Sequence, residues 1–275
     1  MNTRVVTTTS TTPERGITTT PARRAPRLAG VVGLYFAVTT VSAGLIGSVQ
    51  PLLRVDPVII ELVQFGPTLG VLAVLLVWRG RWRPPSAVRP IPSPGVLTRL
   101  VAVAAVCAGL LGAVIGAYAL LGEDVRYTRP GALTHSFWLI AAAQFLGACG
   151  EEFGWRGFLQ PYLRTRYGVL TTGTTVGLLW GVWHVQVFAA GPAYAAAFLL
   201  STIAMSVIMA VLLERARGGH LIIAGTFHAV VNLGLLLLMP EEDGDVTAMT
   251  VFAAACVLAA LVVLGWAGAR GRVRR

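Results

Sequence analysis

The residues of this sequence with the most chemical potential stand next to a run of Ala, Leu and Phe. The stretch GACGEEFGWRGFL, residues 147–159, contains Glu151, Glu152 and Arg156, each of which is costly within a membrane. On a helix, Glu152 and Arg156 share one face and can form an ion pair, whereas Glu151 is turned about 100° from Glu152. An ion pair needs only one carboxylate, so the spacing predicts a second, free carboxylate at Glu151. If the helix ended near Gly150 instead, all three charges would lie at the lipid headgroups.

Two further segments carry polar side chains within apolar runs. GLLWGVWHVQVF places His184 near the middle of its run, where a lone histidine is either a packing residue or a base. TFHAVVNL places His228 and Asn232 four residues apart on one helical face. These two side chains suit either the binding of an anionic oxygen or a hydrogen bond between helices.

Other polar residues near apolar runs favour simpler interpretations. Glu61 and Gln64 precede Pro67, at which the helix is expected to kink. We interpret Glu61 as an interfacial residue or as a partner to another helix. His135 and His220 stand at the ends of apolar runs, where we expect them to be solvated.

The composition identifies an integral membrane protein. Of 275 residues, 55% are hydrophobic and 12% are charged, and the mean hydropathy is +0.72. Soluble domains carry about 25% charged residues. The net charge of +10 comes from 22 arginines and no lysine. Because these arginines are scattered between apolar runs, the sequence argues against nucleic-acid binding.

The cysteines and one pair of glycines suggest packing rather than chemistry. Cys107, Cys149 and Cys256 each lie in an apolar run, are odd in number and match no metal motif. We expect them to be reduced, small apolar residues. Gly112 and Gly116 have the small-xxx-small spacing by which membrane helices approach closely.

Eight runs approach the length of about 20 apolar residues that a spanning helix needs. They cover 28–49, 57–77, 100–122, 136–158, 169–190, 193–213, 220–239 and 248–268. The predicted fold class is all-α, a polytopic membrane helix bundle with about eight transmembrane helices in one domain, 28–268. Gly191-Pro192 predicts a tight hairpin. We expect a disordered N-terminal tail over 1–27 and a basic tail over 269–275.

The arginines predict which ends of the helices face the cytoplasm. With the N-terminus inside, 18 of the 22 arginines fall in inner segments, Arg54, Arg126 and Arg129 fall outside, and the remaining Arg156 lies within a helix. The alternation predicts a multi-pass protein of the cell membrane with both termini cytoplasmic. At 1.5 Å per residue, the carboxylates and imidazoles of the three polar segments lie roughly 16 to 24 Å from those inner ends, which predicts one shared site. Water must reach this site, and we expect a polar cavity open to the cytoplasm.

The motifs resemble those of a known family. EExxxR from Glu151, an aromatic-xxx-His that ends at His184, and HxxxN from His228 occur in order within roughly residues 145–235. This pattern is similar to the CPBP family of intramembrane glutamic endopeptidases, which includes the eukaryotic Ras-converting CAAX prenyl protease and the bacterial Abi proteins. Trp180 departs from the pattern, since the family usually has Phe there.

The resemblance implies a role for each of these residues. Glu151 and His184 would activate a water that attacks a peptide carbonyl, and His228 and Asn232 would stabilise the resulting oxyanion. Supporting roles are implied for three more residues: Glu152, Arg156 and Trp180.

The resemblance implies an intramembrane endopeptidase that needs no cofactor and acts on a peptide or membrane-associated protein at the bilayer. The Arg-only, Ala- and Gly-rich composition favours a bacterial substrate such as a leader peptide. A zinc-dependent version of the peptidase is an alternative, although HExxH is absent. Two others are a non-catalytic immunity or scaffold protein with this fold and a transporter that relays protons through the buried Glu and His.

Overall fold

The structure is a computed structural model that describes residues 26–80, 82, 84–86, 94–239 and 244–270. Within these ranges the chain forms helices and no strands, which confirms the all-α fold class. The predicted tails, 1–27 and 269–275, lie almost entirely outside the described residues. The elements in chain order are α1 Leu28–Val49, η1 Leu62–Phe65, α2 Gly66–Val77, α3 Val96–Leu121, η2 Pro130–Ala132, α4 Phe137–Gly154, η3 Trp155–Leu159, α5 Gln160–Arg164, α6 Val169–Trp183, η4 Val185–Ala190, α7 Pro192–Leu213, α8 His220–Leu238 and α9 Val246–Ala269.

Five of these helices, α1, α3, α7, α8 and α9, are long and apolar enough to cross a membrane. Two shorter apolar helices cover Leu62–Val77 and Val169–Trp183. The chain is therefore a multi-pass membrane protein. It stays a prediction that the chain crosses the membrane eight times and that both of its ends are cytoplasmic.

Three of the predicted spans differ from regular α-helices. The span 57–77 becomes helical only at η1, and Pro67 lies in the first turn of α2 instead of kinking a helix. Proline is tolerated there because the first N–H groups of a helix have no intrahelical partner. The span 136–158 changes to a π-helix over η3, and the span 169–190 stops at Trp183.

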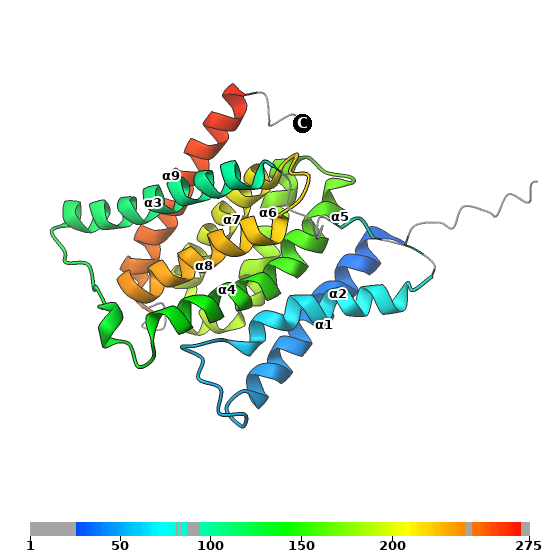
Figure 1. The fold of residues 1–275 in the computed structure, drawn as a ribbon, viewed down its shortest axis with the longest axis horizontal. Coiled ribbons are helices and arrows are strands. Elements are labelled where there is room, and N and C mark those ends of the chain that lie inside the picture. Colours follow the sequence, from blue (N-terminus) through cyan, green and yellow to red (C-terminus); the bar gives the residue numbers. More distant parts are fainter. Residues whose placement is uncertain (1–25, 81, 83, 87–93, 240–243, 271–275) are drawn as a thin grey trace, which may run out of the picture.

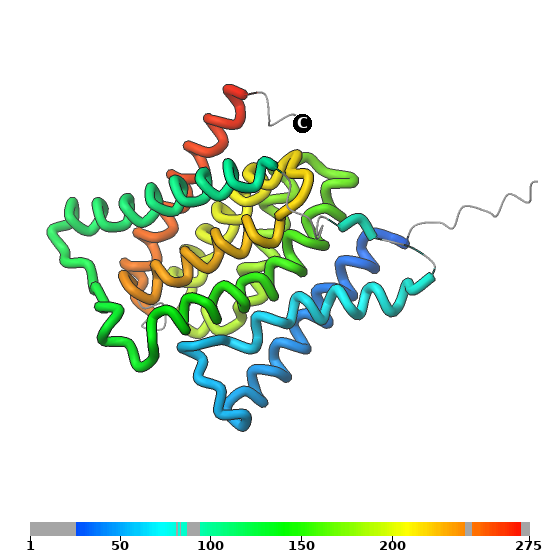
Figure 2. Tube along the Cα trace, viewed as in Figure 1, coloured from blue at the N-terminus to red at the C-terminus, as the bar shows by residue number. Residues whose placement is uncertain are grey.

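The helices pack as pairs around a shared interior. Helix α6 packs on α7, α7 on α9, α4 on α8, and α1 on α2, while α2 also contacts α4. Figure 1 shows α1 and α2 together along one side of the bundle and α3 against α8 and α9 on the other. Figure 2 traces the chain from α4 through η3 into α5 without a break.

Glycines on α4 allow the segment around Gln64 and Pro67 to approach closely. A Cβ at Gly150 would lie 2.8 Å from the Phe65 ring, and one at Gly154 would lie 2.4 Å from Pro67 Cβ. Real Cβ atoms do not come this close, so these positions require glycine. With Gly150 and Gly154 against this segment, Glu151 and Glu152 project from other sides of α4.

A second glycine face joins α6 to α7. Cβ atoms at Gly173 and Gly177 would lie 3.0 Å from Val207 Cα and 2.6 Å from Ile203 Cα, respectively. The predicted packing pair on α3 is wrong, because a Cβ at Gly112 or Gly116 would meet nothing within 4 Å. The functional small-residue spacing lies on α6 instead, where close packing is what draws membrane helices together.

Polar contacts tie the ends of the helices together. The Arg99 guanidinium donates to the carbonyl oxygens of Leu212 and Glu214 at the end of α7. Arg164 binds the Glu214 carboxylate through Nη2 at 2.7 Å and Nε at 3.2 Å. These contacts join the α3 start, the α5 end and the α7 end at one side of the bundle.

At the other end, His135 is not simply solvated as predicted. Its Nε2 lies 2.8 Å from Asp56 Oδ2, and this hydrogen bond holds the pKa of the Asp56 carboxyl below its usual range. The contact links the connection before α2 to the start of α4. The three cysteines are free, as predicted.

We expect Gly177→Ala to destabilise the protein, because the added methyl group overlaps the α7 backbone and overpacking costs about 1–3 kcal/mol. Gly109→Ala is the matched control, since a Cβ at that position on α3 meets nothing within 4 Å. Thermal unfolding in detergent should show a lower Tm for Gly177→Ala and no loss for Gly109→Ala. Equal Tm values for the two variants would contradict the close α6–α7 packing.

Candidate active site

The predicted ion pair of Glu152 and Arg156 forms at the junction of α4 and the π-helix. Arg156 Nη1 donates to Glu152 Oε1 at 2.9 Å, and both side chains are fully buried. The alternative that places these charges at the headgroups is therefore wrong. The π-helix, in which the Gln160 N–H bonds to the Trp155 carbonyl, is a form that recurs at functional sites.

The same carboxylate oxygen also binds His228 on α8. His228 Nδ1 lies 2.9 Å from Glu152 Oε1, and because a carboxylate only accepts, Nδ1 is the donor. His228 Nε2 then carries a proton only when the imidazole is charged. The spacing of the sequence did not predict this contact, which makes Glu152 the junction between α4 and α8.

Glu151 is buried, but the prediction that its carboxylate is free is wrong. Its Oε2 accepts a hydrogen bond of 2.9 Å from Trp180 Nε1 on α6, and only 3% of the residue is exposed. The Arg156 guanidinium also stacks over the Trp180 ring, with its Cζ atom 4.6 Å from the ring centroid. One aromatic side chain thus fixes the orientation of the second carboxylate and stacks against the cation.

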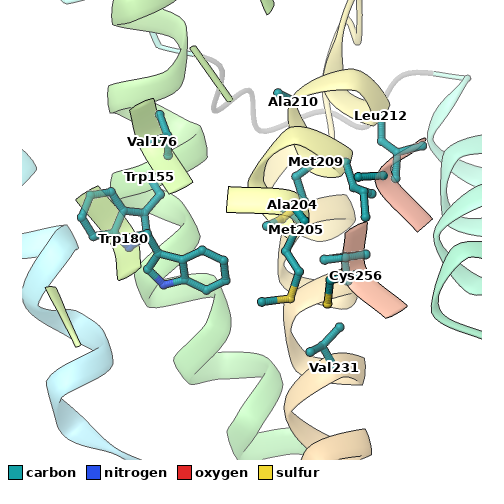
Figure 3. Close-up of a cluster of buried hydrophobic side chains, with 14 of the residues drawn as sticks. Trp155, Val176, Trp180, Ala204, Met205, Met209, Ala210, Leu212, Val231 and Cys256 are labelled. Carbon is teal, nitrogen blue, oxygen red and sulfur yellow. The ribbon is translucent and has the colours of Figure 1, made fainter. Parts of the chain in front are cut away.

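Trp180 also lies between the two imidazoles. Its ring centroid is 5.1 Å from that of His228 and 6.0 Å from that of His184. Figure 3 shows Trp180 and Trp155 among the buried side chains, with Met205 and Cys256 across the core. The residues of α4, α6 and α8 therefore meet around one tryptophan.

His184 lies at the end of α6 and not in the middle of a helix as predicted. The helix ends at Trp183, and His184 Nδ1 lies 2.8 Å from the Trp180 carbonyl oxygen. A carbonyl only accepts, so Nδ1 donates and Nε2 of the neutral ring carries the free lone pair. This side chain is only partly buried and can offer Nε2 as a base.

Asn232 forms a contact with a residue that the sequence analysis missed. Its Nδ2 donates to Gln144 Oε1 at 3.3 Å, and both side chains line a cavity. Gln144 is seven residues before Glu151, on the same face of α4. The spacing of seven residues between Gln144 and Glu151 was the feature of the sequence that could have indicated Gln144 as a residue of the site.

A cavity of about 560 Å³ joins these residues. Its polar lining comes from four helices and the segment before α2: Glu61, Gln64, Gln144, Glu151, Trp180, His184, Gln186, Ser201, Thr202, His228 and Asn232. All four predicted catalytic residues and Trp180 lie on this wall, whereas Glu152 and Arg156 lie behind it. Glu61 lines the cavity, so it belongs to the site and is not merely interfacial.

The direction of the cavity conflicts with part of the sequence prediction. Its wall includes Pro57, Thr128, Ala190 and Gly244, from the connections that the arginine pattern assigns to the outer side. The prediction that both termini are cytoplasmic and the prediction that the cavity opens to the cytoplasm therefore cannot both hold in this structure.

Zinc does not fit the arrangement of the carboxylates. Among the described residues, no group of three His, Cys, Asp or Glu side chains is placed to hold a metal ion. Glu151 accepts from an indole N–H, and Glu152 accepts from a guanidinium and an imidazole. These contacts occupy Oε2 of Glu151 and Oε1 of Glu152, and we derive no step through a metal.

The fold and the site define a class: a multi-pass helical membrane protein with paired carboxylates and imidazoles beside an interior cavity. Residues 133–234 match the family model described as type II CAAX prenyl endopeptidase Rce1-like. This segment holds all seven predicted site residues, and the match confirms the predicted resemblance. Over these residues the chain is similar to the CAAX-type intramembrane proteases.

The chain is also similar to a curated bacterial protein. Lysostaphin resistance protein A of Staphylococcus aureus, in strains RF122, Newman and USA300, is 26% identical over 237 residues. The alignment covers 86% of this chain and 55% of the relative. The chain therefore spans about half the length of the curated relatives that it matches.

We expect Arg156→Met to destabilise the protein strongly, because it leaves the buried Glu152 carboxylate without its guanidinium partner, at a cost of about 3–5 kcal/mol. Arg164→Met is the matched control, since its ion pair with Glu214 is 28% and 21% exposed and such pairs contribute about 1 kcal/mol or less. Free energies of unfolding in detergent mixtures would compare the two. A cost for Arg156→Met no greater than that of the control would contradict the buried ion pair.

Proposed function

We propose that this chain is an intramembrane endopeptidase in which Glu151 and His184 activate water. The single observation that carries the proposal is that these two side chains line one cavity with His228 and Asn232. The match to the Rce1-like family supports it. The substrate class is a peptide or a membrane-associated protein, and the proposal involves neither nucleic acid nor a metal.

In the proposed reaction, Glu151 acts as the general base. Its carboxylate accepts a proton from water, and the water oxygen attacks the peptide carbonyl carbon. His184 Nε2 accepts a hydrogen bond from the same water and orients it. When the tetrahedral intermediate collapses, the C–N bond breaks and the proton moves to the leaving amine nitrogen.

In the proposed reaction, His228 and Asn232 stabilise the oxyanion of that intermediate. Donors held in a dry site lower the barrier by several kcal/mol because they need no reorganisation, and removing one such donor costs about 10²–10³ in rate. Asn232 has an amide N–H₂, and His228 offers Nε2–H when its ring is protonated. Glu152 accepts from the other nitrogen of this ring and so fixes its orientation.

Three residues, Glu152, Arg156 and Trp180, support these roles by positioning the groups that act on the substrate. Trp180 restrains the Glu151 carboxylate through its indole N–H, and Arg156 holds Glu152 in the orientation that binds His228.

The proposal includes eight crossings of the cell membrane, with both ends of the chain cytoplasmic.

A second function has one observation in its favour. The relatives are named for resistance to lysostaphin and not for peptidase activity. A non-catalytic immunity or scaffold protein would keep the packing of Glu152, Arg156 and His228, because these residues hold α4 to α8. It would not depend on the ionisation of Glu151, and this difference separates the two functions.

We expect Glu151→Gln to abolish cleavage, since loss of a general base costs about 10²–10⁴ in rate while an amide can still accept from Trp180. The assay incubates purified protein with a peptide library and detects new termini by mass spectrometry. Glu123→Gln is the control, because this exposed residue does not line the cavity. Wild-type cleavage by a folded Glu151→Gln protein would refute the proposal, as would the absence of any cleavage by the wild type.

We expect the peptidase activity to survive EDTA, because no metal takes part in the proposed reaction. The measurement follows one cleaved peptide before and after incubation with chelator, and again after zinc is added. Activity that is lost with EDTA and restored by zinc would support the zinc-dependent alternative.

A further inference from the structure

The cavity reaches the connections at one end of the bundle. Four connections contribute to its wall: Pro57 and Val58 before α2, Thr128 before α4, Ala190 before α7, and Gly244 before α9. Figure 1 shows these connections gathered at the end of the bundle opposite the start of α1 and the end of α9. We call this the cavity end.

The opposite end contributes nothing to the wall. No lining residue comes from the described parts of the connections after α2, α5 or α7 or from the last turn of α9. Here Arg99 donates to carbonyl oxygens at the end of α7, and Arg164 binds Glu214. These contacts draw α3, α5 and α7 together at this end, which lies away from the lining residues and which we call the closed end.

The two ends differ sharply in charge. The described arginines at the closed end are Arg27, Arg79, Arg99, Arg164, Arg166, Arg215, Arg217 and Arg270, and the one acidic residue described there is Glu214. The cavity end has the opposite balance, with three arginines (Arg54, Arg126 and Arg129) and five acidic residues (Asp56, Glu61, Glu123, Asp124 and Asp245). Arginine-rich connections remain in the cytoplasm during insertion.

We infer that the cavity opens to the non-cytoplasmic side of the membrane, and that the site takes polypeptide segments presented at that surface. The substrate part of this inference rests on the proposed function. The charge asymmetry places the closed end in the cytoplasm, and the lining residues place the mouth at the other end. A leader peptide cut in the cytoplasm would have no path to Glu151, whereas a chain that has crossed the membrane would.

The acidic mouth adds a preference to this inference. Asp56 is directly before the lining residues Pro57 and Val58, and Glu61 itself lines the cavity. Negative charges at the mouth attract positive charges on a substrate and repel negative ones. We therefore expect basic residues near the cleaved bond to be preferred to acidic ones.

Cysteine labelling tests the side of the mouth without any need for activity. Leu52→Cys places a thiol at the cavity end, where Leu52 is 80% exposed, and Tyr167→Cys places one at the closed end, where Tyr167 is 42% exposed. A membrane-impermeant maleimide should label Leu52→Cys in intact cells and Tyr167→Cys only after lysis. The wild-type chain is the blank. The reverse pattern would overturn the inference.

Oriented vesicles test where the substrate enters. A hydrophilic fluorogenic peptide that the solubilised protein cleaves is added outside sealed vesicles. Right-side-out vesicles should cleave it directly, and inside-out vesicles should cleave it only after detergent is added. Cleavage by intact inside-out vesicles alone would overturn the inference.

The two experiments separate two kinds of failure. If the solubilised protein cleaves nothing, the proposed function fails, but the labelling pattern still decides to which side the cavity opens. Within the assay, a peptide with arginine beside the cleaved bond should be cut several-fold faster than one with glutamate there. A preference for glutamate would contradict the role of the acidic mouth.

Discussion

The arrangement of the site depends on one buried oxygen atom, Oε1 of Glu152. It accepts from Arg156 Nη1 and from His228 Nδ1, each at 2.9 Å, in a part of the protein without access to solvent. Removing a carboxylate and a guanidinium from water costs several kcal/mol per ion, and this cost is offset only by good geometry and further hydrogen bonds. The contact therefore constrains the rotation of α4 relative to α8, and with it the direction in which Glu151 points.

The sides of α4 differ in composition. Gly150 and Gly154 allow close packing of the segment from Phe65 to Pro67, whereas the Glu151 and Glu152 carboxylates project from other sides of the helix. On α6, the glycines that contact α7 leave Trp180 to project toward the carboxylates. Small residues thus determine how closely the helices pack, and this packing determines which polar side chains meet in the interior.

The parts of the site that depend on one helix were predictable from the sequence. The i, i+4 spacing correctly predicted that Glu152 pairs with Arg156, and the alternation of apolar runs correctly predicted an all-helical membrane protein. Contacts between helices were not predictable in this way. The bonds from Trp180 to Glu151 and from His228 to Glu152 depend on how each helix is rotated, which spacing within one helix does not define.

The end of α6 also has a cause that hydropathy does not reveal. Residues 169–190 form one predicted span, yet the helix ends at Trp183, and the His184 side chain donates to the Trp180 carbonyl oxygen. Competition of a side chain for a backbone carbonyl is a local reason for a helix to end. The sequence alone does not define the direction of the cavity, because the helical rise gives the depth of a residue but not the end from which a cavity opens.

The most direct test of this account is a double-mutant cycle between Glu152 and His228. Free energies of unfolding in detergent mixtures would be measured for the wild type, for Glu152→Gln, for His228→Gln and for the double variant. Groups that share a buried hydrogen bond show coupling of about 0.5–3 kcal/mol, whereas distant groups are additive within about 0.5 kcal/mol. We predict coupling of about 1–3 kcal/mol for this pair. Additive effects would contradict the claim that Glu152 joins α4 to α8 and orients the site.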